Sequence, residues 1–547
     1  MPGILILQEG LNVVPRYIYS MGIPSYFSHI VRQHRKIIKE YEKKGMTIHN
    51  LYMDCNSLIY DAVRQTMDGH KSRDYESKLI REVCQKIECY IRLLGPTECA
   101  IIAFDGVAPV AKLEQQRGRR YKSHFQKRAL EALGATQSEG WDTVAITPGT
   151  AFMAKLGAAV TGKFASPGRF GLKKIIVSAS DQVGEGEHKI YQHIRDHPSD
   201  HLNSTTVVYG LDADLIMLTL NHLHIAPSMF LFRETPHFIK SLDKTLKPDA
   251  TYFLDIPEFA KALAIDLNDG VEPTTKQKKG RIFDYILLCF FLGNDFLPHF
   301  PALNIRTSGI DTLMDAYRST IGGTNENLVV GTKIIWKNLR KLLQHIAKDE
   351  EFLIREEHDR RDKMARGVDH RKMDPEEALM SVPLRDRRVE SYIDPYSSGW
   401  QQRYYKRLCG FEVDDLRRKQ ISTNYLEGLE WTFKYYTTGC ADWRWCYQYD
   451  YPPLLEDLVK YVPYFDTTLV PVTDAKAVDP LVQLGYVLPG PSLGLLPVNV
   501  RSNLLANHKE WYNSDFEFGW AYCKYFWEAH AHMPRIDLNE LERLVKI

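Results

Sequence analysis

Seven carboxylates in this sequence stand where the folded chain could gather them into a single site. Two negative charges about 4 Å apart repel by roughly 4 kcal/mol at an effective dielectric constant near 20, so such a group must be partly protonated or neutralised by cations. Ligands that are all oxygen, with no histidine or cysteine at metal-ligand spacing, favour two Mg²⁺ or Mn²⁺ ions over zinc. Two such ions activate water and hold the oxygens of a phosphodiester during hydrolysis. The predicted metal-binding and catalytic residues are Asp54, Asp105, Glu185, Glu187, Asp212, Asp214 and Asp295.

The sequence around these acids permits a close approach of substrate. Residues 184–187 read Gly-Glu-Gly-Glu, and residues 211–214 read Leu-Asp-Ala-Asp. Small residues beside a carboxylate let backbone and substrate come near it. A single acid at such a position is more simply explained as a helix N-cap. Acids placed after several successive apolar runs favour a shared site instead.

A basic segment follows the second of these acids directly. Between Lys112 and Arg128 there are seven basic side chains and one acidic one. A basic helix is usually a solvated surface, but this one begins next to a predicted metal-site acid. The guanidinium group of arginine can donate two parallel hydrogen bonds to phosphate oxygens, and lysine adds a positive point charge. Four residues share one helix face and are predicted to hold a terminal phosphate of a nucleic acid: Lys112, Gln116, Arg119 and Arg120.

The elements that must position these groups are four short apolar runs in the first 215 residues. Each run has the length of a strand and is followed by one or two of the acids. Segments with helical periodicity lie between them, which predicts an α/β fold with a mostly parallel twisted sheet flanked by helices. The carboxyl ends of parallel strands meet at one edge, where ligands bind. The runs are residues 51–53, 100–104, 175–177 and 207–209.

Two later stretches differ in composition from this first part. Residues 349–390 are rich in charge and poor in large apolar side chains, which is typical of a solvated helix or a mobile linker. Residues 399–451 are rich in tryptophan and tyrosine. Most of these rings are expected to pack in a core, and one or two could stack on unpaired bases, for about 1–3 kcal/mol per base.

Bulk composition limits the class of protein. The chain has 547 residues, and its 70 basic and 69 acidic side chains leave a net charge of +1, so a nucleic-acid surface requires local segregation of charge. Nine cysteines without a Cys-x-x-Cys pair suggest reduced thiols inside a cell. The apolar run at residues 285–292 is too short to span a membrane. An intracellular protein is predicted, with the cytoplasm favoured over the nucleus, and a monomer with unknown protein partners.

In its ordered motifs the sequence resembles the XRN family of 5′→3′ exoribonucleases. The first group of matching segments is MGIP at 21–24, MDCNS at 53–57, FDGVAP at 104–109, the basic segment 112–120, ITPGT at 146–150, GEGEHK at 184–189, YGLDADL at 209–215 and GNDFLPH at 293–299. A second group is GWxxRYY at 399–405, LEW at 429–431 and MPRID at 533–537. This number of motifs in order is very specific.

The resemblance implies a function and a role for each motif. The seven acids would bind the metal ions, and the pocket on the basic helix would accept a 5′-monophosphate and refuse a cap or a triphosphate. The substrate would be single-stranded RNA, hydrolysed processively to mononucleotides in RNA decay. Tyr60 stands where the family has a base-stacking histidine, and Trp431 is the second predicted stacking residue. A core like that of PIN and flap nucleases is implied, with a second, mixed α+β region wrapped around it.

The resemblance also divides the chain. We expect an N-terminal extension at 1–20, a nuclease core at 21–345, a charged linker or helical segment at 346–395 and a second conserved region at 396–547. Val183 and Ala151 replace a usual proline and glutamate of the family. The chain shows neither the long C-terminal modules of cytoplasmic members nor a zinc knuckle, and such a minimal form would suit a compact genome such as that of a virus.

Two other functions are alternatives to this one. A flap-type DNA nuclease is built on a similar acid-lined sheet, but it should continue after its last acid into a glycine-rich duplex-binding helix. Here Asp295 is followed by FLPHFPAL. A catalytically dead RNA-end-binding protein should have lost at least one of the acids, and all seven are present.

Overall fold

The computed structural model describes residues 26–42, 45–66, 74–132, 141–210, 212–233, 246–247, 250–367, 373–513 and 516–546. The predicted extension at 1–20, the MGIP segment at 21–24 and Leu211 lie outside the described residues.

The described residues form a central seven-stranded sheet with the order β1-β7-β6-β5-β2-β3-β4. The five strands from β6 to β4 run parallel. At the other edge, β7 pairs antiparallel with both of its neighbours, β6 and β1. The mostly parallel sheet predicted from the four apolar runs is therefore confirmed. The strands are β1 (Ile38–Glu40), β2 (Asn50–Asp54), β3 (Cys99–Ala103), β4 (Lys174–Ser178), β5 (Thr206–Tyr209), β6 (Met229–Phe232) and β7 (Tyr252–Asp255).

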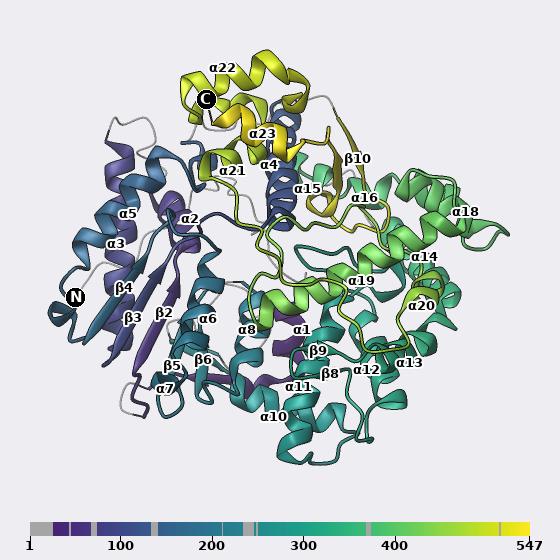
Figure 1. Cartoon of the computed structure of the whole chain (residues 1–547), viewed down its shortest axis with the longest axis horizontal. Helices are drawn as coiled ribbons and strands as arrows, with labels where there is room; N and C mark the ends of the chain where they lie inside the picture. Colours follow the sequence, from purple (N-terminus) through teal and green to yellow (C-terminus); the bar gives the residue numbers. More distant parts are fainter. Residues whose placement is uncertain are drawn as a thin grey trace.

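Helices cover both faces of this sheet, as parallel strands require. Tyr52 and Val208 face one core with α6 (Gly186–Asp196), α8 (Asp214–His222), α10 (Ile256–Leu267) and α11 (Thr275–Phe290). Met53 and Val207 face the other core with α2 (Asn56–Gln65), α3 (Tyr75–Leu94) and α5 (Ala151–Lys163). Figure 1 shows α3 and α5 on one side of the sheet and α6 and α8 on the other. The strand order reverses between β2 and β5, and this is where ligands bind in open α/β sheets.

The rest of the chain packs onto these layers. Helices α12, α13, α19 and α20 share the core of α8 and α11, and α21 to α23 pack against the long helix α4 (Figure 1). The remaining helices are α1 (Tyr26–Gln33), α4 (Val110–Ala132), α7 (Pro198–His201), α12 (Gly309–Thr320), α13 (Trp336–Ala347), α14 (Glu350–Arg366), α15 (Pro375–Met380), α16 (Val382–Arg385), α17 (Arg388–Ile393), α18 (Trp400–Tyr404), α19 (Asp415–Thr437), α20 (Leu455–Tyr461), α21 (Pro480–Val487), α22 (Val498–Asn507) and α23 (Leu538–Val545). Two small sheets pair β8 (Val329–Val330) with β9 (Lys333–Ile334), and β10 (Glu517–Gly519) with β11 (His530–His532).

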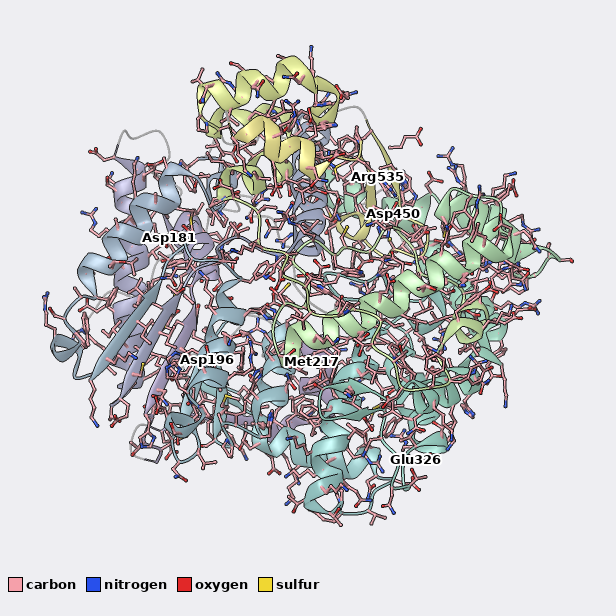
Figure 2. The ribbon with its side chains drawn as sticks, in the orientation of Figure 1. Asp181, Asp196, Met217, Glu326, Asp450 and Arg535 are labelled. Carbon is pink, nitrogen blue, oxygen red and sulfur yellow. The ribbon has the colours of Figure 1, made fainter. Side chains whose placement is uncertain are left out.

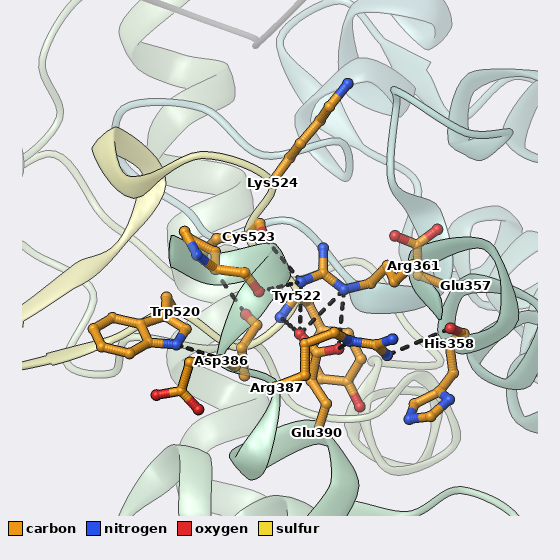
Figure 3. Close-up of polar contacts among 12 residues, drawn as sticks. Glu357, His358, Arg361, Asp386, Arg387, Glu390, Trp520, Tyr522, Cys523 and Lys524 are labelled. Atoms are coloured by element: carbon orange, nitrogen blue, oxygen red, sulfur yellow. Dashed lines mark hydrogen bonds and ion pairs between the residues drawn. The ribbon is translucent and has the colours of Figure 1, made fainter. Parts of the chain in front are cut away.

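The described residues of the charge-rich stretch form helices, and part of their charge is buried. Arg361 of α14 is 1% exposed and pairs with the equally buried Glu390 at 2.7 Å. The same guanidinium donates to the carbonyl of Cys523 at 2.8 Å, and Glu390 accepts the backbone N–H of Tyr522 at 2.8 Å. Figure 3 shows this cluster, with Arg387 also turned toward Glu390. The prediction of a solvated segment was wrong here because charges within the stretch neutralise one another when buried together.

Charge is otherwise found mainly at the periphery. In Figure 2, Glu326 lies at the edge of the molecule, whereas Met217 of α8 lies in its interior, where it is fully buried. No helix within the described ranges is long and apolar enough to cross a membrane.

Candidate metal and substrate site

The predicted acids gather at the carboxyl edge of the parallel strands. Asp54 is the last residue of β2, and Asp105 follows β3 by two residues. Glu185 is the N-cap of α6 and Glu187 lies in its first turn, where the positive end of the helix dipole favours a carboxylate. Asp212 and Asp214 follow β5 and start α8, and Asp295 follows α11. Strands far apart in the sequence therefore bring these groups to one edge.

Direct contacts join the acids after β2, β3 and β4. Asp105 accepts the amide of Asn56 at 2.5 Å and the backbone N–H of Gly186 at 2.7 Å. A Cβ atom on Gly186 would lie 2.6 Å from Oδ1 of Asp54, so only glycine fits between this carboxylate and α6. The Gly-Glu-Gly-Glu motif thus permits close approach, as the sequence suggested.

Lys112 connects the acids to the basic helix α4. Its ammonium group lies 2.5 Å from Glu185 and 2.6 Å from Asp295, and the side chain is buried. Burial would lower the pKa of Lys112, but the two carboxylates hold this pKa well above its usual value. Lys112 therefore differs from its predicted role as a phosphate ligand: in this structure its charge is paired with two of the acids.

The carboxylates influence one another strongly. Burial raises the pKa of Asp54 well above its usual value, and Asp105 and Asp212 raise it further. Burial together with Asp212 does the same for the pKa of Glu187 and of Asp214. The pKa of Asp212 rises to about 6 for the same reason, with Asp295 adding to the effect of burial. One lysine does not neutralise the cluster.

Three of the acids also keep an oxygen without any hydrogen-bond partner. These buried oxygens are Oδ1 of Asp54, Oε2 of Glu187 and Oδ1 of Asp214. An unsatisfied buried carboxylate oxygen is costly unless a cation or donor meets it. Oxygen-only donors of this kind fit Mg²⁺ or Mn²⁺, so the residues present suit the divalent ions that the sequence predicted.

A more compact group of potential ligands lies elsewhere, on α14. His358, Asp359 and Asp362 offer atoms that all lie within 4.8 Å of one another, the sole group of three found this close within the described part of the chain. Its members have other partners, since Asp362 pairs with Arg387 and Asp359 accepts the hydroxyl of Tyr396. The sheet edge is the stronger candidate for a metal site, because unsatisfied oxygens and mutually raised pKa values occur together there.

The raised pKa values predict how stability depends on pH and cations. A carboxyl group with a higher pKa in the folded than in the unfolded chain stabilises the fold at low pH, and this contribution is lost as the pH rises. For Asp212 the loss runs from the unfolded pKa of about 4 to about 6, and for Asp54, Glu187 and Asp214 it extends higher. We expect Mg²⁺ to raise the melting temperature over that in EDTA more at pH 8 than at pH 6. Equal gains at both pH values in thermal unfolding would contradict this.

The predicted phosphate-binding residues lie along α4 beside the acids. Arg119 makes no hydrogen bond or ion pair with another described residue, and its charge lowers the pKa of Asp212. Arg120 donates to the hydroxyl of Thr147 at 2.8 Å and to Gln116 at 3.5 Å. Burial lowers the pKa of Arg120 to about 10, so it stays charged at neutral pH. Two arginines and an amide thus stand together next to the carboxylate cluster.

The C-terminal part of the chain fixes α4 in this position. The carbonyl of Trp443 accepts the N–H of Val110 at the start of the helix. Arg117, also on α4, is 2% exposed and donates to the carbonyls of Trp511 and Pro534. The geometry of the basic face therefore depends on residues more than 300 positions away.

The two predicted stacking residues have opposite environments. Tyr60 on α2 is 39% exposed, and its proximity to Arg120 raises the pKa of that guanidinium. Trp431 is fully buried, stacks on Tyr435 and Trp445, and donates its indole N–H to the carbonyl of Asp442. The placement of Trp431 corrects the prediction: the ring is part of the core and has no exposed face for a base.

Sequence reasoning missed several residues that support the acids. Asn56 stands two positions after Asp54 and binds Asp105, so its place in the same motif was a usable signal. Gln115 donates to Asp295 at 3.0 Å but lies outside the helix face that the charge pattern singled out. Tyr435 donates to Glu185 at 2.8 Å from a helix 250 positions away, and no local pattern indicates such a contact.

Comparisons with known proteins found a matching family and several relatives. The sequence profile of the XRN 5′–3′ exonuclease N-terminus matches residues 21–235, and that of the Xrn1 helical domain matches residues 277–392 and 385–546. The 5′–3′ exoribonuclease 2 of Debaryomyces hansenii is 24% identical over 95% of this chain and 69% of its own length. The 5′–3′ exoribonuclease 1 of Homo sapiens is 28% identical over 95% of this chain, which spans 34% of the human protein.

A third relative and a solved structure complete the comparison. The 5′–3′ exoribonuclease 1 of Saccharomyces cerevisiae is 26% identical over 87% of this chain and 40% of its own length. The catalytic core of Rad2 in complex with DNA substrate is 14% identical, with a TM-score of 0.30 over 53% of this chain and 68% of that chain. A score this low supports no argument about fold or function.

Proposed function

Because this chain belongs to the XRN family of 5′–3′ exonucleases, we propose that it acts as a 5′→3′ exoribonuclease in RNA decay. In this proposal it hydrolyses single-stranded RNA with a 5′-monophosphate, processively, to mononucleotides. The observation that carries the proposal is that two features meet at one sheet edge: buried carboxylates with unsatisfied oxygens, and a basic helix with an arginine, Arg119, that pairs with no other described residue.

The acids are proposed to hold two divalent cations, Mg²⁺ or Mn²⁺. Such ions supply an activated water and neutralise charge on the phosphodiester when they are bound. Asn56 and the N–H of Gly186 orient Asp105, and Lys112 orients Glu185 and Asp295. The proposed holders of the cations are Asp54, Asp105, Glu185, Glu187, Asp212, Asp214 and Asp295.

The basic face of α4 is proposed to bind the first phosphate of the RNA. Arg119 and Arg120 can donate to its oxygens, with Gln116 beside them and Lys112 at the border with the acids. Tyr60, next to Arg120 and partly exposed, is proposed to stack on the terminal base. In this proposal the basic face holds the 5′-phosphate while the next phosphodiester lies at the acids. Cleavage therefore proceeds from the 5′ end, one nucleotide at a time.

Other features of the proposal rest on the sequence. The nuclease core at 21–345, the segment at 346–395 and the second region at 396–547 are proposed as its units. We also propose that the protein is an intracellular monomer and that it acts in the cytoplasm rather than in the nucleus. A catalytically inactive RNA-end-binding protein is disfavoured because every one of the seven acidic positions is filled.

The function is tested with matched RNAs carrying a 5′-monophosphate, 5′-triphosphate or 5′-hydroxyl. The wild-type protein with Mg²⁺ should degrade the monophosphate RNA at least about 10-fold faster than the others, since each charge-assisted hydrogen bond to the phosphate contributes about 1.5–3 kcal/mol. EDTA should abolish degradation. The double variant Arg119→Ala, Arg120→Ala should lose the preference among 5′ ends. Equal degradation of all three RNAs by the wild type would refute the proposed end recognition, and activity in EDTA would refute the cation site.

A further inference from the structure

Two adjacent tyrosines on α19 reach the acid cluster from the second region of the chain. The C-terminal end of α19 lies beside α8, which begins with Asp214, and reaches Glu185 at the N-cap of α6 (Figure 1). Neighbouring residues on a helix point about 100° apart, so Tyr435 and Tyr436 meet different partners. Both side chains are buried, with 2% and 1% exposure.

Tyr435 contacts the acid that starts α6. Its hydroxyl donates to Oε1 of Glu185 at 2.8 Å, while Lys112 holds Oε2 of the same carboxylate. The ring is stacked on His188, with centroids 3.7 Å apart, and on Trp431 at 5.0 Å. Aromatic neighbours on both faces leave the ring little freedom to turn. Tyr435 is therefore built to hold one oxygen of Glu185 in a fixed direction.

Tyr436 contacts the acid that starts α8. Its hydroxyl lies beside the carboxylate of Asp214 and lowers the pKa of that group against the effect of burial. The backbone carbonyl of Tyr436 accepts the amide of Asn221, a residue of α8, at 2.5 Å. Since Oδ1 of Asp214 has no partner, the phenol leaves one oxygen of this carboxylate available to a cation. Tyr436 thus ties α19 to α8 at two points and orients Asp214.

Neutral donors suit this position better than charged ones. Burial raises the pKa of Tyr435 and Tyr436 well above the usual tyrosine value, and the neighbouring acids raise it further, so both hydroxyls keep their protons. A phenol can direct a carboxylate without competing with a cation for its charge, as an ammonium group would.

From this geometry we infer that Tyr435 and Tyr436 are positioning residues for the divalent cations: they fix Glu185 and Asp214 so that the cluster binds these ions tightly. The inference rests on the proposed cation-dependent nuclease function. According to this inference, the second region, residues 396–547, helps the nuclease core to bind its cations, in addition to packing against it. Hydrogen-bond partners of ligating carboxylates commonly contribute a factor of 10–100 to metal affinity.

The test compares Tyr435→Phe and Tyr436→Phe with the matched control Tyr404→Phe. Tyr404 of α18 is equally buried, but its hydroxyl donates to the carbonyl of Pro452 at 3.0 Å and to no carboxylate in the acid cluster. Binding of Mn²⁺ to each protein without RNA is followed by electron paramagnetic resonance. RNA degradation is measured against Mg²⁺ concentration with the 5′-monophosphate and 5′-hydroxyl substrates.

Each of the two variants should bind Mn²⁺ about 10-fold more weakly and need about 10-fold more Mg²⁺ for half-maximal rate. The rate at saturating Mg²⁺, the KM for RNA and the preference for the 5′-monophosphate should stay near those of the wild type, and Tyr404→Phe should match the wild type throughout. Unchanged Mn²⁺ binding in both variants would overturn the inference. A wild-type protein that binds no Mn²⁺ or degrades no RNA would overturn the proposed function instead.

Discussion

Replacing Asp212 by alanine is expected to lower the rate of RNA degradation by on the order of 10³-fold, a typical loss when electrostatic stabilisation is removed at a reacting centre. Asp212 lies at the middle of the cluster: its charge raises the pKa of Asp54, Glu187 and Asp214. Removing it takes away a proposed cation ligand and part of the charge that attracts the second ion. RNA binding should persist, because the basic face of α4 is untouched.

Two further variants make this prediction specific. Asp212→Asn keeps the volume and the acceptor for the N–H of Asp214 but lacks the charge, so it should lose activity to a similar extent. Asp181→Asn changes an exposed acid after β4, labelled in Figure 2, and should retain activity. Single-turnover degradation and RNA binding by fluorescence anisotropy are measured side by side. Normal turnover by Asp212→Ala would show that the cluster is not the catalytic centre.

Replacing Arg361 by methionine is expected to destabilise the protein by about 3 kcal/mol, because the buried Glu390 then loses one of its two guanidinium partners and keeps Arg387 alone. Arg361 also donates to the carbonyl of Cys523, so the change removes a link between α14 and the C-terminal part of the chain (Figure 3). Burial would raise the pKa of Glu390, and the two guanidinium groups of Arg361 and Arg387 hold this pKa below its usual value instead.

The neighbouring arginine provides the control for this effect. Arg360 pairs with Glu356 at 2.9 Å, but both side chains are more than one third exposed, and exposed pairs contribute about 0–1 kcal/mol. Arg360→Met should therefore shift the denaturant midpoint little, and Arg361→Met should shift it strongly. Equal, small shifts for both variants would mean that the pair buried in this structure is solvated in solution.

The sequence by itself predicted the four parallel strands β2 to β5 and the acids that follow them. Strand-length apolar runs separated by helical segments leave few arrangements other than a parallel sheet, since crossover connections force neighbouring strands to run the same way. Asp54 and Asp105 could be assigned to one edge because each follows its apolar run directly in the sequence. Asp295, which follows α11, was assigned to the site because of its motif GNDFLPH at 293–299. In the structure, Lys112 connects Asp295 to Glu185.

Only the tertiary structure decided which groups are buried and what they contact. Trp431 and Tyr60 are both aromatic residues on helices, yet one is enclosed by Tyr435 and Trp445 and the other is exposed. Arg361 and Arg360 are neighbours in a charged stretch, and just one of them meets a buried acid. The physical reason is the same in each case: burial and pairing depend on partners brought close by the fold from distant positions, whereas local periodicity reports the direction of a side chain and not what it meets.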